Sequence, residues 1–201
     1  AGDTTWLKLV AVMPVAFADM RVLTGSKTVY LPGTTAERDA ATRLTGLTFE
    51  ATYRAAVTRL IAQVFDDTGI VVSVCRDGDR RSFQTQYDLL TSGRNVTNSG
   101  PGESNHNFGQ AVDLGFAGLR WLRRNGTVVE NEDSWMHQLD PNQRADGESL
   151  FLWDMLRNAG TTAGLFRGPL SDRPHLQAWS DAGIDMATRL AVLLTSSGTM
   201  R

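Results

Sequence analysis

The stretch Ser104-Asn105-His106-Asn107-Phe108-Gly109-Gln110-Ala111-Val112-Asp113 leads from a polar loop into a short strand. Residues 93–110 are rich in Gly, Asn and Ser and predict a long irregular loop, and such loops inside a compact domain are usually functional or disordered. Residues 111–116 are mostly apolar and predict the strand. The sequence therefore predicts that a loop histidine, His106, and a strand carboxylate, Asp113, converge on one point.

The alternation of side chains along a strand determines what Asp113 can face. Ala111 and Asp113 share one face of the predicted strand, whereas Val112 and Leu114 point to the other face. Asp113 can therefore face a cleft while its neighbours face the core. Gly109 allows a sharp turn of the backbone before the strand, and Ala111 leaves room beside a bound ion.

A second segment, Asp172-Arg173-Pro174-His175-Leu176-Gln177, supplies a third ligand and another carboxylate. A catalytic zinc site needs about three protein ligands and an open position for water. His106, Asp113 and His175 form a set of two histidines and one carboxylate that suits a single zinc ion. Asp172 precedes His175 by three residues, where it can take a proton from an activated water and pass it to a leaving amine.

Helices and strands are mixed irregularly around these segments. Thr34 and Glu37 predict a capping box at the start of a helical stretch that runs to about Phe65, with a break near Gly46. The apolar stripe of its second half comprises Tyr53, Ala56, Leu60, Ile61 and Val64. The other predicted elements are a strand over 70–75, a helix over 82–92 ending at Gly93, a strand at Val128-Val129, a helix from Gly147 to Asn158 stopped by Gly160, an extended segment over 172–177 and a helix over 179–197. The absence of regular βαβ alternation favours an α+β fold.

Composition indicates one ordinary globular domain. The chain has 201 residues, of which 41% are hydrophobic and 21% are charged. A net charge of −2 gives no indication of a nucleic-acid groove or a basic membrane surface. The single cysteine, Cys75, cannot form an internal disulfide and is expected to be a buried thiol. A membrane span needs about 20 mainly apolar residues in a row, and no segment of the sequence approaches that length.

The beginning of the chain imitates a secretion signal. Lys8 precedes an apolar run over 9–18, and Ala16-Phe17-Ala18 resembles a cleavage site. Pro14 interrupts the run and Asp3 weakens the region before it, so a buried N-terminal element is the favoured interpretation. We expect the chain to begin inside a longer parent protein or after processing.

Both polar segments resemble those of a known family. Ser104–Asp113 matches all five fixed positions of the S-x-H-x-x-G-x-A-x-D motif of the M15 peptidases. This family contains D-alanyl-D-alanine carboxypeptidases and dipeptidases, and L-alanyl-D-glutamate endopeptidases of phages and bacteria. Asp172–Gln177 resembles the D-x-P-H-F-Q motif of the endopeptidase branch, with Leu176 in place of Phe. The carboxypeptidase branch has Glu as its base, so Asp172 favours the endopeptidase branch.

The resemblance covers roughly residues 70–178 and implies a role for each matched residue. It implies that His106, Asp113 and His175 bind zinc and that Asp172 is the catalytic base.

A third match lies upstream, where the family has R-[ST]-x-x-x-Q followed by L-x-x-x-G-R. Here the chain reads Arg81-Ser82-Phe83-x-x-Gln86 and then Leu89-Leu90-x-x-Gly93-Arg94. The family's arginine binds the substrate carbonyl or the developing oxyanion, a task that suits a permanently charged fork of donors. Arg81 is the favoured equivalent. Arg76 is its competitor, because Ser73-Val74-Cys75-Arg76 resembles the family's S-G-Y-R strand ending.

Three further residues are candidates for contacts around the ligands or with substrate. Ser104 is expected to hydrogen-bond within the ligand loop and to orient His106. Gln86 is included because it belongs to the upstream match. His137 has no counterpart in the family and is interpreted as a partly exposed structural histidine, with a contact to substrate from the cleft wall as the alternative.

The resemblance implies one catalytic domain over residues 1–201, of the hedgehog/DD-peptidase type, with an antiparallel sheet flanked by helices. Within it, residues 1–65 form an arm and helices without a family match, residues 70–178 form the zinc peptidase core, and residues 179–201 form a C-terminal helix.

The implied activity is hydrolysis of a peptidoglycan stem-peptide bond, L-Ala–D-Glu or a similar L,D bond, outside the cytoplasm in the periplasm or cell wall. Secretion, or delivery as an endolysin or effector within a larger particle, would bring the chain there. Two alternatives stay open: a D,D-carboxypeptidase acting on D-Ala-D-Ala termini, and a zinc-containing binding module without turnover. Asp172 argues against the second alternative, because a binding module needs no base.

Overall fold

The computed structural model of the chain describes residues 21–22, 29–75, 77–93, 97–117, 120–122, 128–130, 148–170 and 172–178. The helices in this part are α2 (Thr35–Arg43), α3 (Ala51–Thr68), α4 (Phe83–Thr91), the 3-10 helix η2 (Asn105–Phe108) and α5 (Glu148–Thr162). The strands are β1 (Arg21–Val22), β2 (Val29–Leu31), β3 (Val72–Val74), β4 (Ala111–Phe116), β5 (Arg120–Leu122), β6 (Val128–Glu130), β7 (Phe166–Arg167) and β8 (His175–Gln177).

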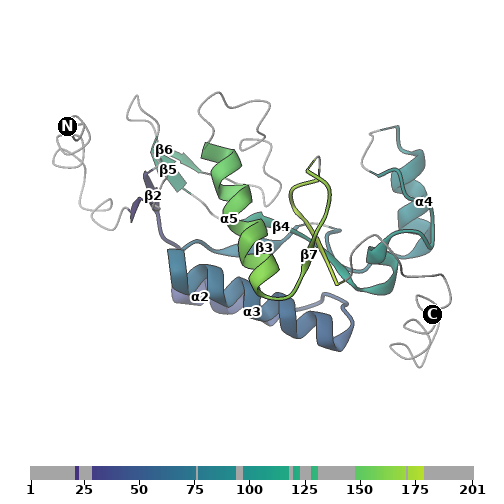
Figure 1. Cartoon of the computed structure of the whole chain (residues 1–201), viewed down its shortest axis with the longest axis horizontal. Coiled ribbons are helices and arrows are strands. Elements are labelled where there is room, and N and C mark those ends of the chain that lie inside the picture. Colours follow the sequence, from purple (N-terminus) through teal and green to yellow (C-terminus); the bar gives the residue numbers. More distant parts are fainter. Residues whose placement is uncertain are drawn as a thin grey trace.

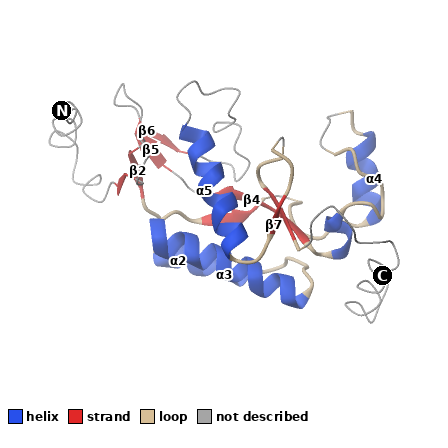
Figure 2. Ribbon diagram, viewed as in Figure 1, coloured by secondary structure: helices blue, strands red, loops and turns tan. Residues whose placement is uncertain are grey.

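The described strands form two antiparallel sheets with the orders β1-β2-β5-β6 and β3-β4-β8-β7. Helices α2 and α3 run along one side of the molecule, and α5 packs against α3 (Figures 1 and 2). Helix α4 projects at the far end of the molecule from β2, β5 and β6. This mixture of helices and antiparallel strands confirms the predicted α+β class.

Strand β4 is central to the second sheet, because β3 pairs with one of its edges and β8 with the other. All of its residues are buried, and the Asp113 side chain is only 5% exposed. In the register between β4 and β8, Asp113 lies directly opposite His175. The fold therefore places two of the predicted ligands beside each other through backbone pairing.

The long helical stretch expected from Thr34 is two helices. The predicted capping box is present, since the Thr34 side chain accepts from the Glu37 amide while the Glu37 carboxylate accepts from the Thr34 amide. Helix α2 ends with Leu44 in the left-handed conformation, and Glu50 caps the start of α3. The break falls near Gly46, as predicted, and α3 ends at Gly69 with a φ of 76°.

The core forms between α3, α5 and the β3-β4-β8-β7 sheet. The predicted apolar stripe of α3 is buried together with Val57. Tyr53 on this stripe donates its hydroxyl to the backbone carbonyl of Leu176 over 2.8 Å, which ties α3 to β8 beside His175. The stripe therefore supports the strand that carries the third predicted ligand.

Gly160 was predicted to stop the helix that begins at Gly147, and that prediction is wrong. Helix α5 continues to Thr162, and Gly160 lies inside it. A Cβ at Gly160 would come within 2.7 Å of Leu176 Cδ1. The glycine therefore serves close packing of α5 against β8, and this gain offsets its low helix propensity of about 1 kcal/mol relative to alanine.

Some of the other predicted helices and strands lie within the described residues, and some lie outside them. Strand β6 and helix α4 confirm the elements predicted at Val128-Val129 and over 82–92, and β3 is shorter than the strand predicted over 70–75. The predicted helix over 179–197 and the predicted N-terminal element over 9–18 lie outside the described residues. Among the described residues, no helix combines the length and apolarity that crossing a membrane requires.

The Tyr53 hydroxyl gives a test of this packing. Tyr53→Phe leaves the carbonyl of Leu176 without this donor in a buried place, so we expect the free energy of unfolding to fall by about 1–3 kcal/mol. Urea denaturation measures the change. Tyr87→Phe is the matched control, because Tyr87 is 52% exposed on α4 and should cost almost nothing. Equal stability of both variants would contradict the proposed support of β8.

Candidate metal centre

His106 is presented by a short, capped turn. Ser104 caps η2, and its hydroxyl accepts a hydrogen bond from the His106 amide over 3.3 Å. Gly109 ends the turn with a φ of 69°, a conformation that favours glycine, and a Cβ there would meet the Glu50 amide nitrogen at 3.0 Å. The turn therefore reverses the chain immediately before β4 and directs His106 back towards Asp113.

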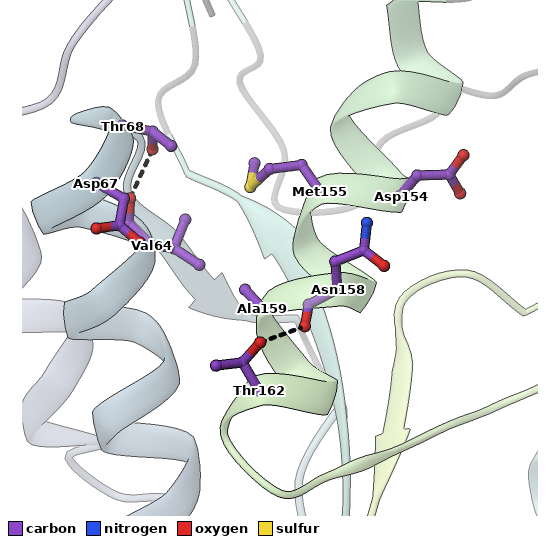
Figure 3. A pocket seen from close by; sticks show the side chains of 8 residues that line it. All are labelled: Val64, Asp67, Thr68, Asp154, Met155, Asn158, Ala159 and Thr162. Atoms are coloured by element: carbon purple, nitrogen blue, oxygen red, sulfur yellow. Dashed lines mark hydrogen bonds between the residues drawn. The ribbon is translucent and has the colours of Figure 1, made fainter. Parts of the chain in front are cut away.

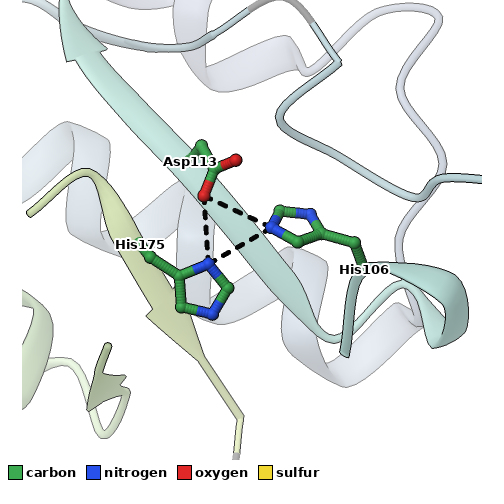
Figure 4. Close-up of side chains that lie close together, drawn as sticks. All are labelled: His106, Asp113 and His175. Carbon is green, nitrogen blue, oxygen red and sulfur yellow. Dashed lines mark hydrogen bonds and ion pairs between the residues drawn. The ribbon is translucent and has the colours of Figure 1, made fainter. Parts of the chain in front are cut away.

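The three predicted ligands come together in the structure (Figure 4). His175 Nδ1 lies 3.0 Å from Asp113 Oδ1, and His106 Nε2 lies 3.3 Å from the same oxygen. The two ring nitrogens are 3.2 Å apart. His106 and Asp113 are buried, and the His175 side chain is 12% exposed. A single ion could therefore contact all three residues.

Each of the three predicted ligands also has a nitrogen or oxygen that faces away from the cluster. Each of these outer atoms contacts a different partner. His106 Nδ1 lies 2.8 Å from the backbone carbonyl of Asp79, which can only accept, so the ring carries its proton there and turns the lone pair of Nε2 inwards. Arg81 donates to Asp113 Oδ2, which leaves Oδ1 for the centre. His175 Nε2 contacts Gln177 Oε1 at 3.0 Å.

Acceptor atoms that face one another in a buried place repel unless a proton or a cation lies between them. Two imidazole nitrogens and one carboxylate oxygen form such a set of acceptors here. Divalent transition metals bind these same kinds of atom in proteins. The chemistry of the donor set therefore fits a metal ion. His106, Asp113 and His175 are the residues that could hold it.

The electrostatics of the cluster favour an ionised carboxylate. Burial acts to raise the pKa of Asp113, but the positive charge of His106 and His175 when these rings are protonated, together with their hydrogen bonds, outweighs burial and holds this pKa well below its ordinary value. Ionised Asp113 is the form that binds a cation.

Asp172 stands beside the cluster. Its side chain is 51% exposed, and its Oδ2 lies 4.0 Å from His175 Nδ1, the nitrogen that faces the centre. Burial, followed by the negative charge of Asp113, raises the pKa of Asp172 above its ordinary value. A bound cation would act on the same carboxyl group in the opposite direction.

Arg81 lies beside the cluster and contacts the ligand Asp113, a contact that the sequence did not indicate. Its side chain is 8% exposed and donates to the carboxylate of Asp113 and to the carbonyl of Asp77. Its backbone amide donates to the carbonyl of His106 over 3.0 Å. These contacts make Arg81 a support for two ligands. Its competitor Arg76 lies outside the described residues.

Gln86 is not part of the cluster. It is fully buried on α4 and donates to Thr97 Oγ1 and to the carbonyl of Ser99, so it holds the loop that precedes η2. His137 lies outside the described residues, and the structure does not place it.

Several residues that support the site were missed by sequence reasoning. Gly78 packs so closely that a Cβ would meet the carbonyl of Asp113 at 2.7 Å, and its own carbonyl accepts from the Asp113 amide. Nothing in the local sequence Asp77-Gly78-Asp79 indicates that this segment lies against β4.

Arg157 was also missed, because an arginine in a helix is most often solvated. It is 3% exposed on α5 and donates to the carbonyls of Gly168, Pro169 and Asp172. It thereby holds the loop that carries Asp172 beside the cluster.

A separate hollow lies between α3 and α5 (Figure 3). Its lining residues are Val64, Asp67, Thr68, Asp154, Met155, Asn158, Ala159 and Thr162. None of the predicted site residues is among them.

No protein-family model matches the chain, and none of the curated proteins matches it in sequence. Fold and site together define an α+β protein with a buried His-Asp-His cluster that could hold a metal ion.

The ligand set predicts which substitutions abolish metal binding. Loss of a residue that only contacts a metal ligand typically weakens metal affinity by about 10–100-fold. Loss of a ligand itself should weaken zinc affinity by more than that, and we expect this for His106→Ala, Asp113→Ala and His175→Ala. Competition with a chelator of known affinity measures the change. His137→Ala is the matched control and should retain tight binding. Loss of zinc in that variant and its retention in His106→Ala would refute the ligand set.

Proposed function

We propose that this chain is a zinc metallopeptidase that hydrolyses a peptidoglycan stem-peptide bond, L-Ala–D-Glu or a similar L,D bond. The observation that carries the proposal is the convergence of His106, Asp113 and His175 with Asp172 beside them. The three ligands and the acid stand at the positions of the M15 motifs that the two segments resemble. The proposal thus combines a geometric observation with a sequence resemblance that covers the same residues.

A zinc ion held by the three ligands would supply an activated water, with a pKa of about 7, and polarisation of the substrate carbonyl. The chain's own residues would do the rest. Asp172 would receive the proton of the attacking water on its carboxylate and return it to the leaving amine. Its half-exposed position beside the cluster suits a group that meets both water and substrate.

Arg157 supports this role for Asp172. A carboxylate that transfers protons must be held within hydrogen-bond reach of its partners. The guanidinium of Arg157 fixes the loop of Asp172 from beneath through backbone carbonyls, with a distance of 2.6 Å to that of Gly168. The loop can therefore hold its shape while the Asp172 carboxylate stays free for chemistry.

Arg81 would act chiefly by holding Asp113, since its guanidinium donates to Oδ2 of that carboxylate. Its charge beside the cluster would also favour a developing oxyanion, the role that the family resemblance implies.

Asp in place of Glu before the last histidine favours an endopeptidase over a D,D-carboxypeptidase. The site of action would be the cell wall or periplasm, reached by secretion or by delivery as an endolysin or effector. The chain would act on peptide without a nucleic-acid partner.

Purified muropeptides with intact stems provide the test. The zinc-loaded wild type should split the L-Ala–D-Glu bond, and mass spectrometry identifies the fragments. Asp172→Asn keeps the size of the side chain but removes the base, so the rate should fall by about 10²–10⁴-fold with zinc affinity nearly unchanged. Asp66→Asn is the control, because Asp66 is 58% exposed and lies in an ion pair with Arg38.

The products separate the alternatives. Loss of terminal D-Ala without stem cleavage would assign a D,D-carboxypeptidase. Tight zinc binding with no cleavage of any muropeptide would assign a binding module. Full activity of Asp172→Asn would show that another group is the base.

A further inference from the structure

The ring of His175 is held from both of its nitrogens. Nδ1 faces Asp113 and His106, and Nε2 lies 3.0 Å from Gln177 Oε1. This contact follows from strand geometry, because residues two apart on β8 point to the same side. Gln177 is 3% exposed, so solvent does not compete for its amide group.

A second amide fixes the orientation of the Gln177 side chain. Asn105 Nδ2 donates to Gln177 Oε1 over 2.9 Å. The oxygen thus turns towards both Asn105 and His175, and an amide oxygen can only accept. The proton of a neutral His175 ring must then lie on Nε2, which leaves the lone pair of Nδ1 for a metal.

Asn105 maintains this arrangement at a cost. It is 8% exposed, and its Oδ1 has no hydrogen-bond partner among the described residues. A buried acceptor without a partner destabilises a fold by about 1–3 kcal/mol. Asn105 also immediately precedes His106, so one turn carries both a ligand and the residue that orients the amide opposite another ligand.

We infer that Asn105 and Gln177 are positioning residues that select the Nδ1-binding form of His175 and thereby set the affinity of the centre for its metal. The inference rests on the metal centre of the proposed function. If both amides turned by 180°, Gln177 Nε2 would donate to His175 Nε2, the ring proton would move to Nδ1, and the ring could not bind the ion at that atom. In the orientation that the structure shows, Gln177 Oε1 faces His175 Nε2 instead.

Zinc affinity of three variants tests the inference. Gln177→Met keeps the length of the side chain but removes the strong acceptor, so zinc should bind about 10–100-fold more weakly. Gln177→Glu keeps an acceptor at the same place and should bind within a few-fold of wild type. Gln84→Met is the control: Gln84 lies on α4, and its side chain donates to Asp88 one turn further along the same helix. Its zinc affinity should not change.

A spectroscopic measurement on the wild type keeps the inference testable even where a variant fails to fold. Two-bond ¹H–¹⁵N spectra of the zinc-loaded chain distinguish protonated from metal-bound ring nitrogens. We expect His175 to be protonated at Nε2 and His106 at Nδ1. Binding of zinc through Nε2 of His175 would overturn the inference, as would unchanged affinity of Gln177→Met. A wild type that binds no zinc at all would refute the proposed function, and the inference would fall with it.

Discussion

The pairing of β8 with β4 is the constraint on which the rest of the site depends. It places His175 directly opposite Asp113, so that backbone hydrogen bonds, not flexible side chains, bring the two ligands together. A slip of one residue in this register would turn His175 to the other face of the strand. Tyr53 from α3 and Gly160 from α5 both pack against Leu176, the neighbour of His175. The hydrophobic core therefore holds the register that the site requires.

Burial gives this cluster its chemical character. Two imidazoles and a carboxylate that lie within 3.3 Å of one another would be costly in an apolar interior without a cation or shared protons. The structure lowers this cost at the outer atoms, where the Asp79 carbonyl, Arg81 and Gln177 each contact one ligand. Such outer contacts define the orientation of each ligand and its protonation state. A preformed centre of this kind loses little conformational freedom when an ion enters.

The sequence predicted the parts that depend on short-range patterns. Local spacing predicts the capping box of α2, the apolar stripe of α3, the bounds of β4 and the three candidate ligands. Contacts between distant segments were not predictable, because no local pattern encodes them: Arg157 beneath the loop of Asp172 is such a contact, and so is the carbonyl of Asp79 at His106. The prediction at Gly160 is wrong because local propensity favours a helix end at a glycine. Close packing of α5 against β8 instead requires this glycine inside the helix.

X-ray absorption spectroscopy on the zinc-loaded chain tests the central claim most directly, because it reports the atoms around the ion without relying on activity. We predict one zinc per chain with two imidazole nitrogens, one carboxylate oxygen and one further light ligand at about 2.0–2.2 Å. The same spectrum of His175→Ala should lose one imidazole. An ion surrounded by oxygen alone, or a wild-type spectrum with fewer than two imidazoles, would contradict the account.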